Sequence, residues 1–170
     1  MQSVLPVLAI LGGILMVFAA AMLVPLAFAF FGGDAGLSAH CGAILVTFGC
    51  GLALFWSCKR FKRELQPRDG FLLVSLVWSV LPAFGALPLL FHIPGLSFTD
   101  AYFEAVSGLT TTGSTVLTGL EKLPLSINVW RCFMVLLGGM GILVLAVAIL
   151  PLLGVGGSQL FKAETPGPMK

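Results

Sequence analysis

Charged residues are scarce in this sequence. Only 9% of its 170 residues are Asp, Glu, Lys or Arg, whereas 58% are apolar and the mean hydropathy is +1.08. A soluble domain carries about 25% charged residues, so the shortage excludes that class. The net charge of +2 is also too small to indicate a nucleic-acid-binding protein. The sequence therefore predicts an all-α integral membrane protein, because helices satisfy their own backbone hydrogen bonds in lipid.

Residue types that carry catalysis are equally few. The four cysteines form no CxxC pair, and the two histidines, His40 and His92, flank separate apolar segments. The sequence also contains no Ser/His/Asp set, no paired carboxylates and no phosphate-binding glycine loop. We therefore expect neither an enzyme nor a bound cofactor, and we expect the cysteines to pack as small apolar side chains.

Four long apolar segments are present instead. Each has at least about 20 residues, which is enough to cross the roughly 30 Å hydrocarbon core of a bilayer. Glycine and alanine recur in the second segment, where small residues would let helices approach closely. Prolines 82 and 88 are expected to bend the third. The predicted spans are residues 4–31, 37–58, 71–91 and 127–153.

The basic residues predict the orientation of these spans. Residues 59–70 hold five of the nine Lys and Arg residues, and Lys162 and Lys170 lie in the polar tail. By the positive-inside rule, this middle loop and both termini are cytoplasmic. A loop that binds nucleic acid or anionic lipid is the less favoured alternative. Pro67, Asp69 and Gly70 are expected to mark a break before the third span.

A short helix is predicted over residues 97–108, between the last two spans. Ser97 or Thr99 would cap its N-terminus, and Asp100 and Glu104 would suit the dipole of its first turns. A helix of about a dozen residues is too short to cross a bilayer. We therefore expect it to enter the membrane and return.

A polar stretch at residues 107–115, here called the Thr-rich segment, follows this helix. It carries six hydroxyl side chains and two glycines, so it cannot face lipid as a helix. Successive threonines favour extended backbone and offer oxygens, while Gly113 permits a conformation that other residues avoid. Oxygen-rich backbone of this kind can replace the water shell of a cation. We therefore expect an ion filter at Thr111, Thr112 and Gly113, supported by Thr110 and Ser114.

Several motifs together resemble the Trk/Ktr superfamily of potassium transporters, and within it the TrkH-type uptake subunits. The resemblance is most specific in the short helix with its filter and in the helix that follows. It rests on residues 98–114, 130–131 and 137–142, and extends to residues 68–71 and 161–168.

The resemblance implies a fold and a function. Members have four span–pore helix–span repeats around one ion path, in the bacterial inner membrane. Gly113 matches the family's filter glycine, and Thr111 and Thr112 match residues whose oxygens bind K⁺. A cytoplasmic nucleotide-binding regulatory subunit is the expected partner, besides lipid.

The domain organisation expected from the resemblance has three parts. Residues 1–66 would form two N-terminal transmembrane helices and the basic loop, residues 67–160 the first pore repeat, and residues 161–170 a cytoplasmic tail. A single repeat implies either further repeats in a longer protein, which we favour, or assembly of several copies. Potassium uptake is the expected function; the alternative is a truncated, non-conducting membrane scaffold.

Overall fold

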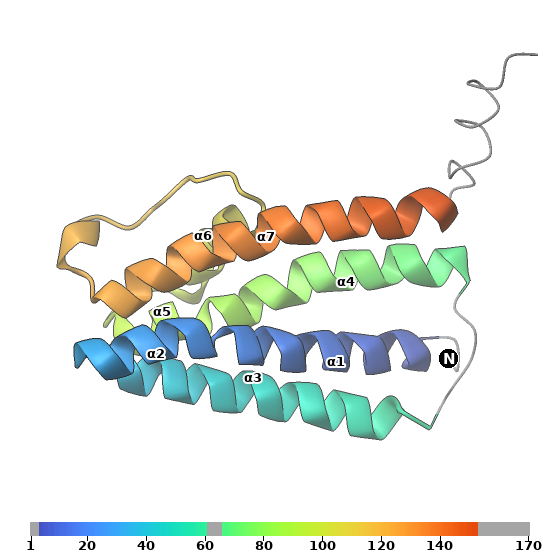
Figure 1. Cartoon of the computed structure of the whole chain (residues 1–170), viewed down its shortest axis with the longest axis horizontal. Helices are drawn as coiled ribbons and strands as arrows, with labels where there is room; N and C mark the ends of the chain where they lie inside the picture. The colour runs from blue at the N-terminus through green and yellow to red at the C-terminus, as the bar shows by residue number, and fades with distance from the viewer. Residues whose placement is uncertain (1–3, 61–65, 153–170) are drawn as a thin grey trace, which may run out of the picture.

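The computed structural model describes the backbone of residues 4–60 and 66–152, and the side chains of residues 4–60, 66, 68–142. The expected tail at 161–170 lies outside the described residues. All regular structure in the described part is helical (Figure 1). The elements are α1 (Leu5–Ala21), α2 (Leu23–Gly32), α3 (Leu37–Cys58), α4 (Pro67–Gly85), α5 (Leu87–His92), α6 (Phe98–Leu109), the 3-10 helix η1 (Leu120–Lys122) and α7 (Leu125–Leu152).

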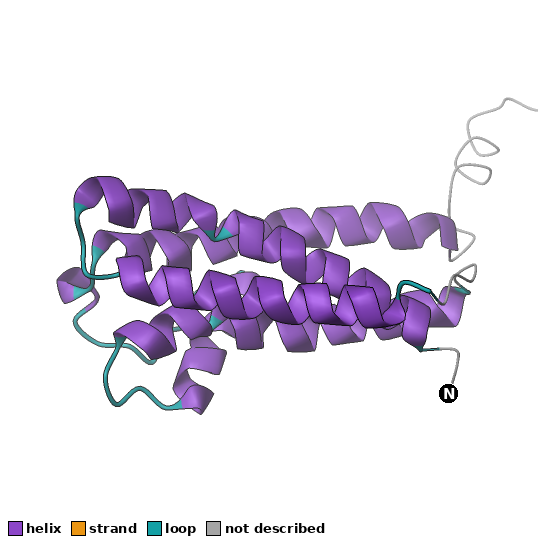
Figure 2. Ribbon diagram, turned by 90° about the horizontal axis from the view of Figure 1, so that it is seen from below, coloured by secondary structure: helices purple, strands orange, loops and turns teal. Residues whose placement is uncertain are grey.

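Four stretches of the described chain are long and apolar enough to cross a membrane: Leu5–Gly32, Leu37–Cys58, Arg68–His92 and Leu125–Ile142. They lie roughly parallel in one bundle (Figures 1 and 2). The turn containing Asp34 and the helix η1 lie at one end of the bundle, called the Asp34 end, and Arg68 lies at the other, called the Arg68 end. The four predicted apolar segments are therefore helical and long enough to span a membrane.

Two of these spans are broken by prolines. The first is interrupted at Met22, between α1 and α2, and the third at Ala86, between α4 and α5. Pro25 and Pro88 follow these breaks within three residues, and each lacks the N–H that would continue the helical hydrogen bonds. The structure therefore has a short interruption of the helix beside Pro88 (Figure 1), whereas Pro82, which was also expected to bend the span, lies within α4.

The third span begins earlier than predicted. Asp69 and Gly70 do not form a break; they lie in the first turn of α4, which starts at Pro67. Gln66 is the N-cap residue, and its backbone N–H donates to Asp69 Oδ2 at 2.9 Å. Proline at the first helical position and an acid at the third both favour a helix start, and this local signal outweighs the turn propensity of the Asp-Gly pair.

Close glycine contacts join α1 to α3. A Cβ atom added to Gly12 would lie 2.7 Å from the carbonyl oxygen of Gly51, and one added to Gly51 would lie 2.9 Å from that of Gly12. The two backbones therefore touch, as small residues permit in membrane helices. Gly49, in the same predicted small-residue set, has nothing within 4 Å. Only part of that set serves helix packing.

A buried apolar cluster lies toward the Asp34 end and packs α7 against α1 and α4. Trp130 is fully buried, and its Nε1 donates to the carbonyl oxygen of Gly85 at 2.8 Å. Its ring lies 5.5 Å from that of Phe18, centroid to centroid. Leu109 and Met134 belong to the same cluster, so the end of α6 is packed onto this core.

Asp34 ties the turn between α2 and α3 to the start of α7. Its carboxylate accepts from the backbone N–H of Ser126 at 2.8 Å, from the Ser126 hydroxyl at 2.9 Å and from the N–H of Gly36 at 2.8 Å. Burial by itself raises the pKa of the Asp34 carboxyl, but these three hydrogen bonds and the charge interaction with His40 together outweigh it and hold that pKa below its ordinary value of 3.8. The folded state thus favours the ionised form.

Replacing Asp34 by Ala is expected to destabilise the fold by about 2 kcal/mol, because hydrogen bonds to a charged group are lost. Thermal unfolding in detergent measures this, with Glu121→Ala as the control acid at the same end of the bundle. Since the folded-state pKa is the lower one, the stabilisation is complete above pH 3.8 and is lost as pH falls through the folded pKa. An equal difference between wild type and Asp34→Ala at pH 7 and at strongly acidic pH would contradict this.

Candidate ion filter

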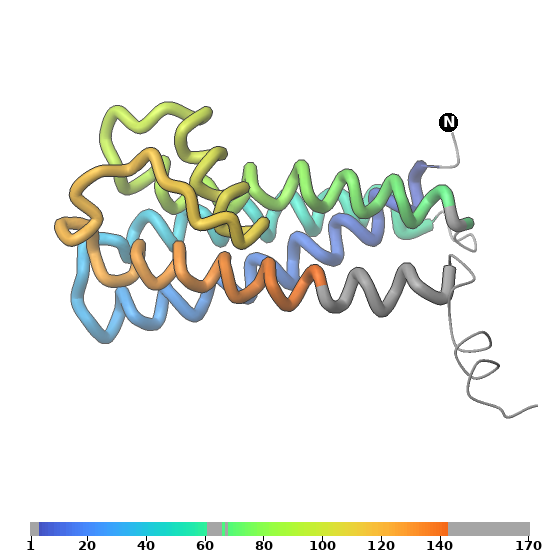
Figure 3. Tube along the Cα trace, turned by 90° about the horizontal axis from the view of Figure 1, so that it is seen from above, coloured from blue at the N-terminus to red at the C-terminus, as the bar shows by residue number. Residues whose placement is uncertain are grey.

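Helix α6 begins with a side-chain cap. The backbone N–H of Asp100 donates to Ser97 Oγ at 3.1 Å, and the Ser97 hydroxyl donates to Asp100 Oδ2 at 2.7 Å. Of the two predicted caps, Ser97 is therefore the one used. The helix has 12 residues, about 18 Å of length, and the chain turns back near the middle of the bundle after it (Figure 3).

The turn at the end of α6 has the hydrogen bonds of a Schellman motif. The N–H of Thr112 donates to the carbonyl oxygen of Ser107 at 2.9 Å, and that of Thr111 to Gly108 at 3.0 Å. This motif requires a left-handed residue after the cap, and Thr111 has φ +58. The expectation of extended backbone along the threonines is therefore wrong at Thr110, with φ −84 and ψ 2, and at Thr111, because the helix end sets their conformations.

Such a conformation is unusual for a β-branched residue and costs about 1–3 kcal/mol. Backbone strain of this size persists only where the surroundings enforce it, and it is concentrated at functional sites. The hydroxyl groups of Thr110 and Thr112 lie 2.8 Å apart and brace the turn, with the Thr110 hydroxyl also donating to Val106 O at 2.8 Å.

Gly113 has φ +78, so its backbone has the conformation that was predicted for it, one that other residues avoid. Nothing lies within 4 Å of where its Cβ would be, so backbone conformation rather than crowding requires glycine here. Within the described part of the chain, the carbonyl oxygens of Thr110, Thr111, Thr112 and Gly113 accept no hydrogen bond. These oxygens are available to a ligand.

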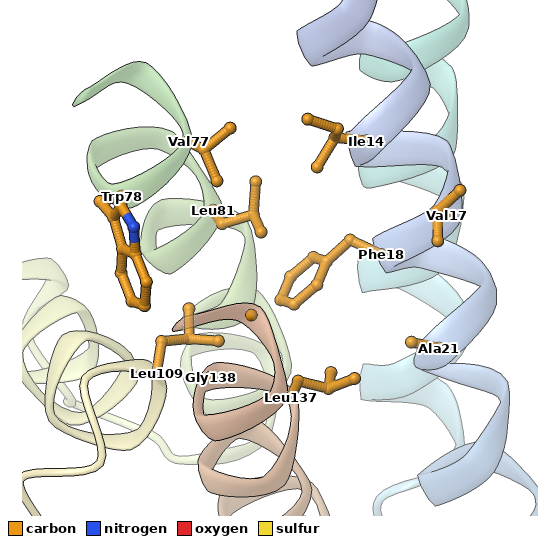
Figure 4. A pocket seen from close by; sticks show the side chains of 11 residues that line it. Ile14, Val17, Phe18, Ala21, Val77, Trp78, Leu81, Leu109, Leu137 and Gly138 are labelled. Atoms are coloured by element: carbon orange, nitrogen blue, oxygen red, sulfur yellow. The ribbon is translucent and has the colours of Figure 1, made fainter. Parts of the chain in front are cut away.

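Two cavities lie near the end of α6, and they differ in chemistry. A cleft of about 110 Å³ beside the Thr-rich segment is lined partly by polar groups of Glu104, Ser107, Ser114 and Arg131. A crevice of about 440 Å³ between α1, α4 and α7 is lined by apolar side chains (Figure 4), apart from the indole nitrogen of Trp78. Only the first offers oxygen atoms near the exposed carbonyl groups.

Glu104 makes contacts that the sequence did not predict. It lies in the second turn of α6, among the first turns as predicted, but it is only 4% exposed and pairs with Arg131 on α7 at 3.1 Å, which the prediction did not include. It also accepts hydrogen bonds from Thr115, Val116 and Leu117. We call these contacts of Glu104 with Arg131 and with residues 115–117 the Glu104 clamp. Sequence reasoning missed it, although the sequence shows both an acid on a short helix and an arginine within the next span.

Helix α7 approaches the end of α6 at Gly138. A Cβ atom added there would overlap the carbonyl oxygen of Leu109 and lie 2.8 Å from its Cα. A Cβ atom added to Gly108 would lie 3.2 Å from the Cβ atom of Met134. The glycines thus let the backbone that leads into the Thr-rich segment lie directly on α7.

Comparison with known proteins agrees with this architecture. Residues 38–170 match the family model described as TrkH, cation transport protein. The chain is 48% identical over 162 residues to the Trk system potassium uptake protein TrkH of Salmonella typhimurium, covering 95% of this chain and 34% of that protein. It is 47% identical over 170 residues to TrkH of Halomonas elongata, covering 99% and 35%.

A solved structure gives the same picture. The crystal structure of the potassium transporter TrkH from Vibrio parahaemolyticus superposes with a TM-score of 0.82 at 42% identity, covering 95% of this chain and 35% of that one. This chain therefore spans about a third of the length of the relatives it matches. The family match over most of the chain, the identity and the shared fold show that it belongs to the TrkH family of cation transport proteins.

Proposed function

We propose that this chain supplies the first pore repeat, residues 67–160, of a potassium-uptake transporter of the bacterial inner membrane. The observation that carries the proposal is the run of carbonyl oxygens from Thr110 to Gly113 that accept no hydrogen bond. They follow a 12-residue helix, which we infer to be re-entrant. A K⁺ ion that leaves water needs several such oxygens at once.

The residues of the filter have separate roles in this proposal. Oxygens of Thr111 and Thr112 bind K⁺, and the positive φ of Gly113 directs the carbonyl groups to the ion path. Thr110 supports Thr112 through the hydroxyl contact, and Ser114 is held by Ser107. Because Arg131 pairs with Glu104, the neighbouring carboxylate is balanced, and neutral oxygens dominate, as suits a large monovalent ion.

The rest of the chain has a supporting place. Residues 1–66 contribute two helices that precede the repeat, and the basic loop places the Arg68 end and both termini in the cytoplasm. A nucleotide-binding regulatory subunit would bind at the Arg68 end, on the cytoplasmic side. One repeat supplies one side of an ion path, and since the relatives are about three times longer, further repeats complete it.

Flux measurements test the function. The chimera used here, and in the experiments below, replaces the matching third of Vibrio parahaemolyticus TrkH by residues 1–170. We expect the chimera in liposomes to take up Rb⁺ and the 170-residue chain alone to take up none. A folded chimera without Rb⁺ flux would overturn the proposal in favour of a non-conducting scaffold, and Rb⁺ flux through the chain alone would show that several copies can form the path.

A further inference from the structure

The backbone that follows the filter is held by side chains of α6. Residues 114–119, called the return segment, form neither helix nor strand. Ser107 Oγ donates to the carbonyl oxygen of Ser114 at 2.6 Å. Glu104, about one helical turn earlier, accepts from the N–H of Val116 at 2.6 Å. These two side chains lie on the same face of α6, and together they align the return segment along the helix.

Glu104 is the more heavily used of the two. Its Oε1 accepts from the Thr115 hydroxyl at 2.5 Å and from the N–H of Leu117 at 3.3 Å, besides Val116. Its Oε2 accepts from Arg131 Nε at 3.2 Å and Nη2 at 3.1 Å. Arg131 Nη2 also reaches Thr115 Oγ1 at 3.3 Å. One carboxylate thus joins α6, the return segment and α7.

The return segment has room to move if this clamp is released. The lining of the cleft of about 110 Å³ includes Gly113 and Ser114 as well as Glu104 and Arg131. Packing alone does not fill this space, so hydrogen bonds determine where Ser114 and the residues after it lie. A shift there would change the direction of the carbonyl groups at Thr112 and Gly113.

We propose that Glu104 is a positioning residue that sets the ion selectivity of the filter, by fixing the return segment through its contacts with Thr115, Val116 and Leu117. It does not contact the ion. This inference rests on the proposed function and adds to it the residue that keeps the filter oxygens at the spacing suited to K⁺. Arg131 neutralises the buried carboxylate and holds its second oxygen.

Glu104→Gln in the chimera tests the inference. Glutamine has one acceptor oxygen, so it cannot serve both Arg131 and the return segment. We expect the Rb⁺/Na⁺ flux ratio to fall about tenfold. In free energy, this change corresponds to the loss of one hydrogen bond to a charged group. The matched control is Asp100→Asn, the other acid of α6, which contacts only the N-terminal cap and should leave the ratio unchanged. A merely structural role would lower both fluxes together.

Thr115→Val provides a second variant that removes one hydroxyl at nearly constant volume. It should also lower the Rb⁺/Na⁺ flux ratio, and it tests the role of Glu104 if the Glu104→Gln variant does not fold. Absence of Rb⁺ flux in the unmutated chimera would overturn the proposed function and this inference with it. A selective chimera whose ratio is unchanged in the folded Glu104→Gln variant, or in Thr115→Val when Glu104→Gln does not fold, would overturn only the role of Glu104.

Discussion

Gly113→Asp in the chimera is expected to abolish selective potassium uptake. Gly113 has φ +78, and an L-residue in that region costs about 1–2 kcal/mol. A strained residue would therefore rotate the peptide groups on either side, including carbonyl groups assigned to K⁺. The added carboxylate would also place a strong charge where neutral oxygens are needed. Growth of a transporter-deficient bacterial strain on low potassium measures the effect, and unchanged potassium-dependent growth would refute it.

Gly95 offers a matched control for this variant. It also has φ +78 and nothing within 4 Å of its Cβ position, but it lies in the turn before α6, outside the filter. Gly95→Asp therefore introduces the same charge and the same backbone strain away from the proposed ion path. We expect it to lose a similar amount of thermal stability while it retains growth on low potassium. If Gly113→Asp and Gly95→Asp lost growth equally, the loss would be due to impaired folding and not to the filter.

Gly138→Val is expected to have the second large effect, a loss of about 3 kcal/mol in the free energy of unfolding. The added side chain would collide with backbone atoms of Leu109, which cannot move aside as a flexible side chain does. Helix α6 would have to separate from α7, and the buried cluster around Trp130 and Met134 would open. Thermal unfolding of the 170-residue chain in detergent measures the loss.

Gly141→Val is the appropriate control for that measurement. Gly141 lies one turn further along the same helix, and nothing lies within 4 Å of its Cβ position. The change in helix propensity is the same for both variants, so the difference between them isolates the contact with α6. Equal stability of the two variants would contradict the close approach at Gly138. Rb⁺ flux in the chimera should be lost only in Gly138→Val.

Features encoded by local sequence were predictable. Apolar length identified the four spans, the Ser97 cap followed from side-chain chemistry at a helix start, and the positive φ of Gly113 followed from glycine's freedom. Each depends on a few adjacent residues. The position of Asp69 was misjudged although its signal was also local, because an Asp-Gly pair can form a turn and its Asp can equally stand at the third position of a helix, as here.

Features that depend on distant residues were not predictable. Glu104 and Arg131 are 27 residues apart, and only packing of α6 on α7 brings them together. Asp34 and Ser126 are 92 residues apart, and no spacing rule joins them. The left-handed Thr111 has a different cause: a helix end normally selects glycine for that place, so a threonine there gives no signal in one sequence.

Glu104 and Arg131 are only 27 residues apart in the sequence. This short separation bears on how a transporter of the relatives' length is synthesised. Chains emerge from the ribosome at about 5–20 residues per second, so Arg131 follows Glu104 by roughly one to five seconds of translation. Closing a loop of this size is entropically cheap. In the proposed longer transporter, the return segment can therefore be fixed by its own repeat during synthesis, and later repeats would then assemble against a filter edge whose shape is already set.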